Sequence, residues 1–243
     1  MNKDKFDFSK VKLHDTTLFT NLSREEFLKE NHLYLLNLSL QPYEKYIKFT
    51  ENYLDTQAEN FQQKHLESIK DENEDWKVSE EYAKRMMEID GEFAQRFRES
   101  IIVQLYSFFE MTIVHSCEMY YSNKEIDNEA EETPEKAGLD YAKAFLKNKA
   151  GIELRLIHQE LDFFCKLRTL RNRLVHHQTT FFTDDEKKIN DIRALSKNRF
   201  QLTMKHGIAP NYFLYFDKPN FSFEIIEKIK SLYEKLGQNG VYY

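Results

Sequence analysis

Glycine and proline are so scarce in this sequence that many kinds of fold are excluded. The 243 residues include only 6 Gly and 4 Pro. Tight turns between strands depend on these residue types, so a sheet-rich fold would lack its turn residues. A chain of this length can bury a sizeable core in one large domain. The sequence therefore predicts a mostly α-helical fold.

The most apolar stretch of the chain predicts a helical bundle with a buried centre. The segment IIVQLYSFFEMTIVHSCEMYY, residues 101–121, is apolar on nearly every face, as expected of a helix surrounded by other helices. Ser23 with Glu26, and Thr183 with Glu186, form capping boxes that mark helix starts. We predict an antiparallel bundle whose helices include, approximately, 42–70, 80–121, 140–149, 153–177 and 221–237.

A different pattern appears near residues 200–216. Apolar and polar residues alternate there in two short runs, with Gly207 and Pro210 between them. This pattern predicts a small β-hairpin or an extended crossing. We divide the chain into an N-terminal helical extension packed on the body, residues 1–79, and a helical domain, residues 80–243.

Charge and cysteine content limit the kinds of partner and compartment. The formal net charge of -6 repels phosphate on average, so contact with nucleic acid needs a local basic patch. Cys117 and Cys165 lie in apolar helical stretches, where a free cysteine behaves as a small hydrophobe and suits a reducing cytoplasm. No run approaches the roughly 18 apolar residues of a membrane span. We expect a soluble cytoplasmic protein with no membrane partner.

Polar residues interrupt the helix predicted at 153–177 near its end, in KLRTLRNRLVHHQ. At about 100° per residue, the side chains can be placed around the helix axis. Asn172 and His176 fall together on one side, with Arg171 and Arg168 beside them. The opposite arc, the expected core stripe, holds Phe163, Leu167, Leu170 and Leu174. The polar cluster therefore faces away from the core of its own bundle.

The RNxxxH spacing has a chemical use in RNA cleavage. A neutral imidazole, with a pKa of about 6.5, can take a proton from a ribose 2′-hydroxyl or return one to a leaving 5′-oxygen. The fork of a guanidinium fits a phosphate or its transition state. An asparagine can orient either group without adding charge. We take Arg171, Asn172 and His176 as candidate catalytic residues of metal-free cleavage that needs no cofactor.

Cations surround this motif in a chain that is acidic overall. The candidate RNA-binding residues are Lys166, Arg168 and Arg173, and three lysines precede them at positions 143, 147 and 149. Such a local reversal of charge is typical of phosphate binding. The alternative interpretation of Lys166 and Arg173 is that they are solvated surface charges.

The order of these segments resembles the HEPN superfamily (higher eukaryotes and prokaryotes nucleotide-binding). The resemblance consists of YSFFE on a long apolar helix, then YAKAFLKNKAGI, then LRTLRNRLVHH ending a second helix, and an amphipathic closing helix. It covers about residues 80–236 and leaves the preceding residues unassigned. Arg171, Asn172 and His176 match the family motif of an arginine, a polar residue and a histidine, position by position.

The resemblance implies both an assembly and an activity. It implies a homodimer in which two motifs face each other across a cleft. It also implies a metal-independent endoribonuclease acting as a toxin or as an anti-phage, abortive-infection effector, with RNA and an antitoxin or other regulatory protein as partners. Family helices carry a further acidic or polar residue facing the motif, for which Glu110 is the candidate. His177 is a second candidate supporting residue.

Other interpretations of the same residues stay open. Glu110 can be a buried acid paired with an arginine or a tyrosine, and His177 can be a cation that favours the helix C-terminus. The other histidines lack metal-ligand spacing, so we expect no metal site. The chain as a whole can instead be a non-catalytic HEPN module that binds RNA, nucleotide or a protein partner. A nucleotide-modified target is a third interpretation, but Thr179 stands where its tyrosine would be expected.

Overall fold

The computed structural model describes residues 23–69, 76–124, 137–177, 180–182, 185–205 and 211–243. The predicted mostly helical bundle with a small hairpin is confirmed. Along the described chain the elements are α1 (Arg24–Ile69), α2 (Trp76–Met86), the π-helix η3 (Met87–Phe93), α3 (Ala94–Glu118), α4 (Tyr120–Asn123), α5 (Gly138–Asn148), the 3₁₀-helix η4 (Leu154–Ile157), α6 (His158–His177), β1 (Thr180–Phe182), α7 (Glu186–Ser196), β2 (Gln201–Lys205), β3 (Asn211–Tyr215) and α8 (Asn220–Gly237).

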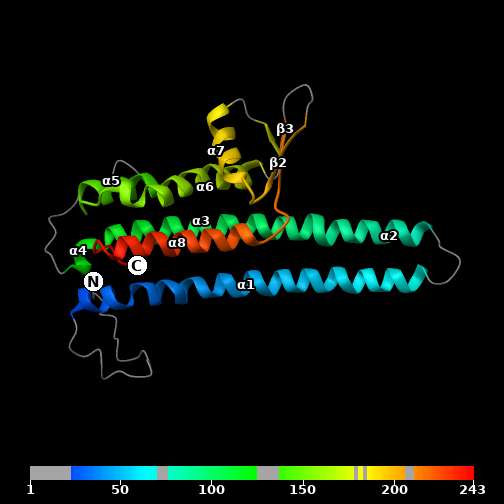
Figure 1. The fold of residues 1–243 in the computed structure, drawn as a ribbon, viewed down its shortest axis with the longest axis horizontal. Coiled ribbons are helices and arrows are strands. Elements are labelled where there is room, and N and C mark those ends of the chain that lie inside the picture. Colours follow the sequence, from blue (N-terminus) through cyan, green and yellow to red (C-terminus); the bar gives the residue numbers. More distant parts are fainter. Residues whose placement is uncertain (1–22, 70–75, 125–136, 178–179, 183–184, 206–210) are drawn as a thin grey trace, which may run out of the picture.

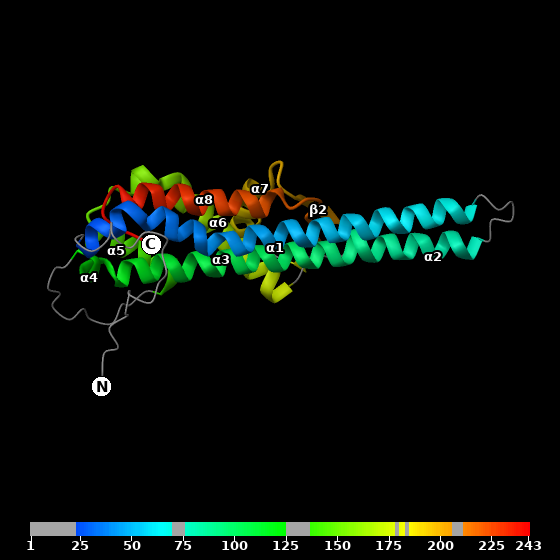
Figure 2. The same ribbon diagram turned by 90° about the horizontal axis from the view of Figure 1, so that it is seen from below.

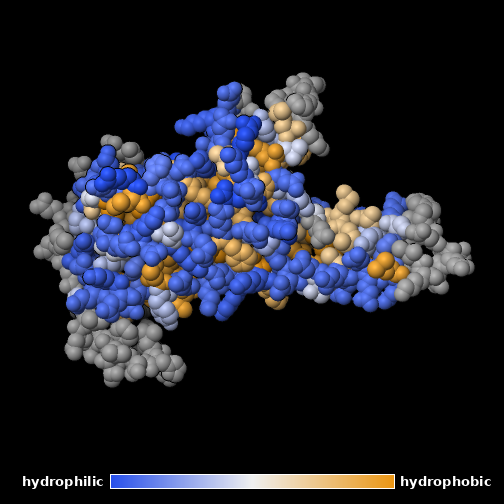
Figure 3. Space-filling model, viewed as in Figure 1, coloured by the Kyte–Doolittle hydropathy of each residue, from blue (hydrophilic) through white to orange (hydrophobic). Residues whose placement is uncertain are grey.

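The long helices lie nearly parallel to one long axis, whereas α7 stands across it (Figure 1). The helices α1, α3 and α8 run side by side, α5 and α6 cover one side of them, and α7 stands with the small sheet at the end of α6. The end of α1 and all of α2 extend beyond the bundle as a two-helix arm, which both views show (Figures 1 and 2). The face seen in Figure 3 is mainly hydrophilic, with apolar residues exposed at several places, including the arm.

The first described helix begins as the sequence predicts. The Ser23 backbone N–H donates to Glu26 Oε2 at 2.9 Å, and the Glu26 N–H donates to Ser23 Oγ at 3.3 Å, which completes the capping box. The helix then continues without a break through Pro42. Pro42 and Leu38 are exposed, so water can satisfy the Leu38 carbonyl that loses its helical donor at Pro42.

The helix predicted from 80 to 121 contains a wider, π-helical segment in the structure and ends at Glu118. The α2 helix passes into the π-helix η3, which contains Gly91, before α3 begins. The predicted domain boundary after residue 79 falls inside α2. Leu36, Leu40 and Ile47 of α1 belong to the same hydrophobic cluster as α3, α6 and α8. The first described helix therefore contributes directly to the main core.

The small sheet has one strand more than the predicted hairpin. Strands β2 and β3 pair antiparallel, and β1 pairs antiparallel with the other edge of β3. Because β1 has only three residues, it shows too little alternation to be recognised in the sequence. The N-cap of α7 is Asp185, whose side chain accepts a hydrogen bond from the Lys188 N–H at 3.2 Å. Thr183, predicted to form a capping box with Glu186, lies outside the described residues.

The α3 helix is the centre of the bundle, as its apolar sequence predicts. Its side chains at Ile101, Leu105, Phe109 and Ile113 are at most 1% exposed. Aromatic rings fill the seam with α6, where Phe109 stacks on Phe164 with ring centroids 3.6 Å apart. Such stacked rings add to the free energy that their burial already supplies.

A buried polar network joins α1, α3 and the end of β3. The Arg98 guanidinium donates to both carboxylate oxygens of Glu51, at 2.9 and 2.6 Å, and to the Phe216 carbonyl at 2.9 Å. One turn earlier, Gln95 donates to the Leu214 carbonyl at 3.2 Å and accepts from the Phe216 N–H at 2.8 Å. These side chains satisfy backbone groups that the short sheet leaves without partners.

We expect Glu51→Ala to lower the free energy of unfolding by about 3–5 kcal/mol, because it leaves the Arg98 charge buried without its partner. Urea unfolding measures this change. Glu59→Ala, on the exposed side of α1, is the matched control and should change stability by less than about 0.5 kcal/mol. Equal unfolding midpoints for the two variants would show that the ion pair does not hold α1 to α3.

Candidate functional site

The α6 helix presents the predicted division between an apolar and a polar side. Leu167 and Leu170 are fully buried, and Phe163 and Leu174 are 7% exposed, so the core stripe is confirmed. Asn172 is exposed. The polar side therefore remains at the surface while the apolar side anchors the helix against α3.

Arg171 is the least satisfied member of the RNxxxH triplet. Its Nη1 donates to Asn172 Oδ1 at 3.1 Å, so the asparagine orients the guanidinium. Its Nε is buried and has no hydrogen-bond acceptor among the described residues. A buried donor without an acceptor costs about 1–3 kcal/mol. The guanidinium is thus oriented by Asn172 at its Nη1 end, while its Nε is enclosed without an acceptor among the described residues.

His176 lies in the last turn of α6, and its side chain is exposed. It follows Asn172 by one turn, so both belong to the same stretch of the polar side. The side chain of His177, the candidate supporting residue beside it, lies outside the described residues.

Two of the three predicted RNA-binding cations are held in ion pairs. Arg168 Nη1 donates to Asp140 Oδ2 of α5 at 2.9 Å, and Lys166 pairs with Asp162 one turn before it on α6. Burial alone would lower the pKa of Arg168, but the hydrogen bond and charge of Asp140 outweigh it and raise that pKa. Arg173, the third cation, is half-buried. The basic patch is therefore smaller than the number of cations suggests.

Glu110 lies at the junction of α3 with the start of α5. Its Oε1 accepts a hydrogen bond from the Tyr106 hydroxyl at 3.2 Å and from the Leu139 N–H at 3.4 Å. Gly138 has φ of 58°, and a Cβ atom there would lie 2.5 Å from Glu110 Oε1. A side chain at position 138 would therefore be strained and would collide with the carboxylate.

The structure does not bring Glu110 to the triplet within one chain. The stacking of Phe109 on Phe164 sets Glu110 level with the first turns of α6. The helices α3 and α6 run antiparallel, and Arg171 lies two turns further along α6, roughly 10 Å along the axis at 1.5 Å per residue (Figure 1). The contacts of Glu110 with a tyrosine and with α5 agree with the structural interpretation of this residue.

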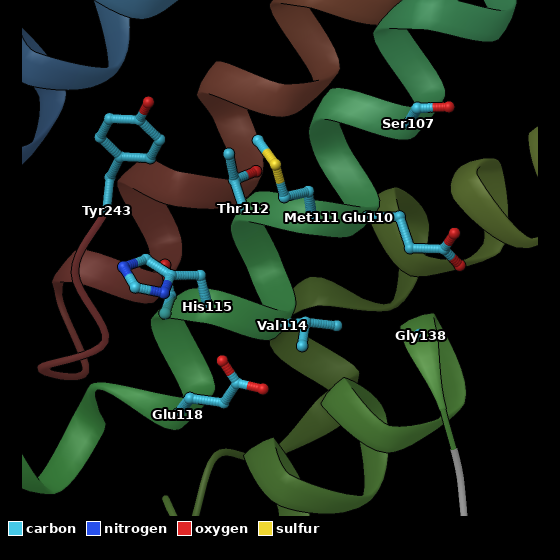
Figure 4. Close-up of a pocket in the computed structure, with 10 residues that line it drawn as sticks. Ser107, Glu110, Met111, Thr112, Val114, His115, Glu118, Gly138 and Tyr243 are labelled. Carbon is cyan, nitrogen blue, oxygen red and sulfur yellow. The ribbon is translucent and has the colours of Figure 1, made fainter.

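A groove beside Glu110 is a feature that the sequence did not indicate. It has a volume of about 760 Å³ and lies along the second half of α3. Glu110 and Val114 lie on the side next to Gly138, while His115 and Tyr243 lie on the other side (Figure 4). Most of its residues lie within α3, where Ser107, Glu110, Met111, Val114 and Glu118 recur at helical spacing on one side, while Gly138 and Tyr243 come from distant parts of the chain. The periodic pattern marks that side of α3, but the residues that border it from elsewhere depend on the fold.

Comparison with known protein families, with curated proteins and with solved structures finds no match. Within the described residues, no group of three or more His, Cys, Asp or Glu side chains is placed to hold a metal ion. A search of the same residues for a helix long and apolar enough to cross a membrane also finds none.

We expect Glu110→Ala to destabilise the chain by about 1–3 kcal/mol, because the Tyr106 hydroxyl and the first turn of α5 lose their shared acceptor. Thermal or urea unfolding measures the change. Glu118→Ala provides the control, since Glu118 is exposed on the same helix and lines the same groove. If both variants were as stable as the parent chain, Glu110 would have no structural role at the α3–α5 junction.

Proposed function

We propose that the chain is a metal-independent endoribonuclease of the HEPN type. The observation that supports the proposal best is the arrangement of Arg171 and Asn172: the guanidinium donates through Nη1 to the exposed Asn172, which orients it at the polar side of α6. A phosphate oxygen is an acceptor that a guanidinium binds strongly. The exposed His176 lies on the same helix, one turn beyond Asn172.

Each residue of the triplet has a distinct role in the proposed reaction. The 2′-oxygen of a ribose attacks the adjacent phosphorus, the bond to the 5′-oxygen breaks, and a 2′,3′-cyclic phosphate forms. His176 takes the proton from the 2′-hydroxyl or gives one to the leaving 5′-oxygen. Arg171 stabilises the negative charge that grows on the phosphate oxygens. Asn172 positions Arg171 through the hydrogen bond to Nη1.

A homodimer would complete such a site. The RNxxxH motif of one chain supplies one histidine, His176, whereas the reaction needs a base at the 2′-hydroxyl and an acid at the 5′-oxygen. Two chains with their α6 ends facing each other would supply both. Val175 is 47% exposed beside His176 and offers an apolar contact for a second chain. This composite arrangement is the one that the HEPN resemblance implies.

The biological role that follows from the resemblance is a toxin or an anti-phage, abortive-infection effector in the cytoplasm. RNA would be its substrate, and an antitoxin or other regulatory protein would restrain it. Cleavage by this route needs no cofactor.

The alternative is a non-catalytic HEPN module that binds RNA, nucleotide or a protein partner. The ion pairs of Arg168 and Lys166 favour it, because paired cations add less to the attraction of phosphate than the sequence suggests. The net charge of -6 favours it as well.

We expect the purified chain to cleave single-stranded RNA in the presence of EDTA and to leave 2′,3′-cyclic phosphate ends. His176→Ala should lower the rate by about 10²–10⁴-fold, the usual contribution of a general acid or base. The measurement is a time course of RNA cleavage with analysis of the product ends.

His158→Ala is the matched control, because His158 is an exposed histidine at the opposite end of α6 and should leave the rate unchanged. Equal cleavage by the parent chain and His176→Ala would refute the catalytic assignment. Binding of RNA without cleavage by either would select the non-catalytic alternative.

We expect Val175→Glu to shift the chain from dimer to monomer and to reduce cleavage in parallel, since it places a charge in the proposed apolar contact. Light scattering after size exclusion measures the mass. Leu156→Glu is the control, because Leu156 is 52% exposed in η4, away from the α6 end. A dimer that survives Val175→Glu unchanged would place the interface elsewhere.

A further inference from the structure

Lys143 of α5 and Cys165 of α6 approach each other more closely than a hydrogen bond explains. The Lys143 Nζ lies 2.5 Å from the Cys165 Sγ. A hydrogen bond from nitrogen to oxygen, a smaller atom than sulfur, already spans roughly 2.7–3.2 Å. A direct bond between nitrogen and sulfur would be much shorter than the observed separation. The spacing therefore fits a link through one small bridging atom.

The surroundings of this pair suit reaction with an oxidant. Both side chains are half-buried, so a small molecule can reach them. The Arg168 guanidinium lies one turn beyond Cys165 on α6 and interacts with it electrostatically. Cationic neighbours and partial exposure are the setting in which protein cysteines react with oxidants.

The other polar and thiol groups considered as alternatives, Asp140, Tyr106 and Cys117, are engaged, protonated or buried. Asp140 is engaged with Arg168. Burial and the nearby Glu110 raise the pKa of Tyr106 far above its ordinary value, so its hydroxyl stays protonated. Cys117, the other cysteine, is fully buried in α3. The Lys143–Cys165 pair is therefore distinguished from it by access.

We propose that Lys143 and Cys165 form a covalent cross-link through a single oxygen, Nζ–O–Sγ, when the chain meets hydrogen peroxide. The inference does not rest on the proposed ribonuclease function. The link would tie α5 to α6 two turns before Arg171. It defines a modification site whose co-reactant belongs to the class of peroxides.

The chemistry balances with two molecules of peroxide. The Cys165 sulfur attacks the first, so that an S–O bond forms, the O–O bond breaks and one water is released, leaving a sulfenic acid. The Lys143 amine is oxidised by the second to a hydroxylamine, with release of another water. The hydroxylamine oxygen then bonds to the sulfenic sulfur and displaces the third water. Nitrogen and sulfur together give up four electrons, and the two peroxides accept them.

Intact-mass spectrometry of the full chain tests the proposal. The reduced protein is freed of reductant, treated with a small excess of hydrogen peroxide and quenched. We expect a species heavier by one oxygen and lighter by two hydrogens, in which peptide mapping joins residues 143 and 165. Excess dithiothreitol should restore the original mass.

Variants at the two positions and at a neighbouring lysine complete the test. Lys143→Arg and Cys165→Ser should lose the cross-linked species entirely, while Lys147→Arg, at an exposed lysine one turn on, should retain it. Lys143→Gln is a second substitution if Lys143→Arg fails to match the parent chain in its circular dichroism. Addition of whole oxygen atoms only, loss of two hydrogens without oxygen, or the same link in Lys143→Arg would each overturn the proposal.

Discussion

The buried contact between Arg98 and Glu51 is the constraint on which the arrangement of the bundle depends. Removing two charges from water is costly unless both are paired and fully hydrogen-bonded. Here the guanidinium meets both carboxylate oxygens and the Phe216 carbonyl, so the charge is satisfied only when α1, α3 and the end of β3 are all in place. Gln95 adds two further bonds to the same backbone. One polar network thus fixes the position of the sheet on the helical bundle.

The sequence predicted those features of the fold that depend on residues close together in the chain. The Ser23–Glu26 capping box and the core stripe of α6 were both recognisable, because a helix brings together residues three or four positions apart. The pairing of Glu51 with Arg98 was not, since either acid or base has many candidate partners at long separation in a helical chain. The third strand was missed for a related reason: β1 exists only because β3 offers it a free edge.

In the candidate site, too, the features set within one helix were predictable from the sequence, whereas the contacts between helices were not. The exposure of Asn172 and the partial burial of Arg171 follow from angles around one helix, which the sequence supplies. The partners of the surrounding cations come from elsewhere: Asp140, which engages Arg168, belongs to α5. The HEPN resemblance made Glu110 a candidate for a further acidic residue facing the motif, but its contacts depend on where α5 starts. Cation counts along a sequence therefore overstate the charge that a surface presents to phosphate.

The π-helix η3 changes the direction in which side chains point around the axis of the long helix formed by α2, η3 and α3. Before η3, the Tyr82 ring stacks on His65 of α1, with ring centroids 4.0 Å apart. After η3, the Arg98 guanidinium donates a hydrogen bond to Glu51, which also belongs to α1. In an unbroken α-helix, at about 100° per residue, these two side chains would point about 160° apart. If the wider π-helical turn holds one extra residue, only fifteen of the sixteen steps from Tyr82 to Arg98 count, and the angle between the two side chains falls to about 60°. The widened turn thus acts as a register correction, which lets one continuous helix keep a single side turned toward α1 from the arm into the core.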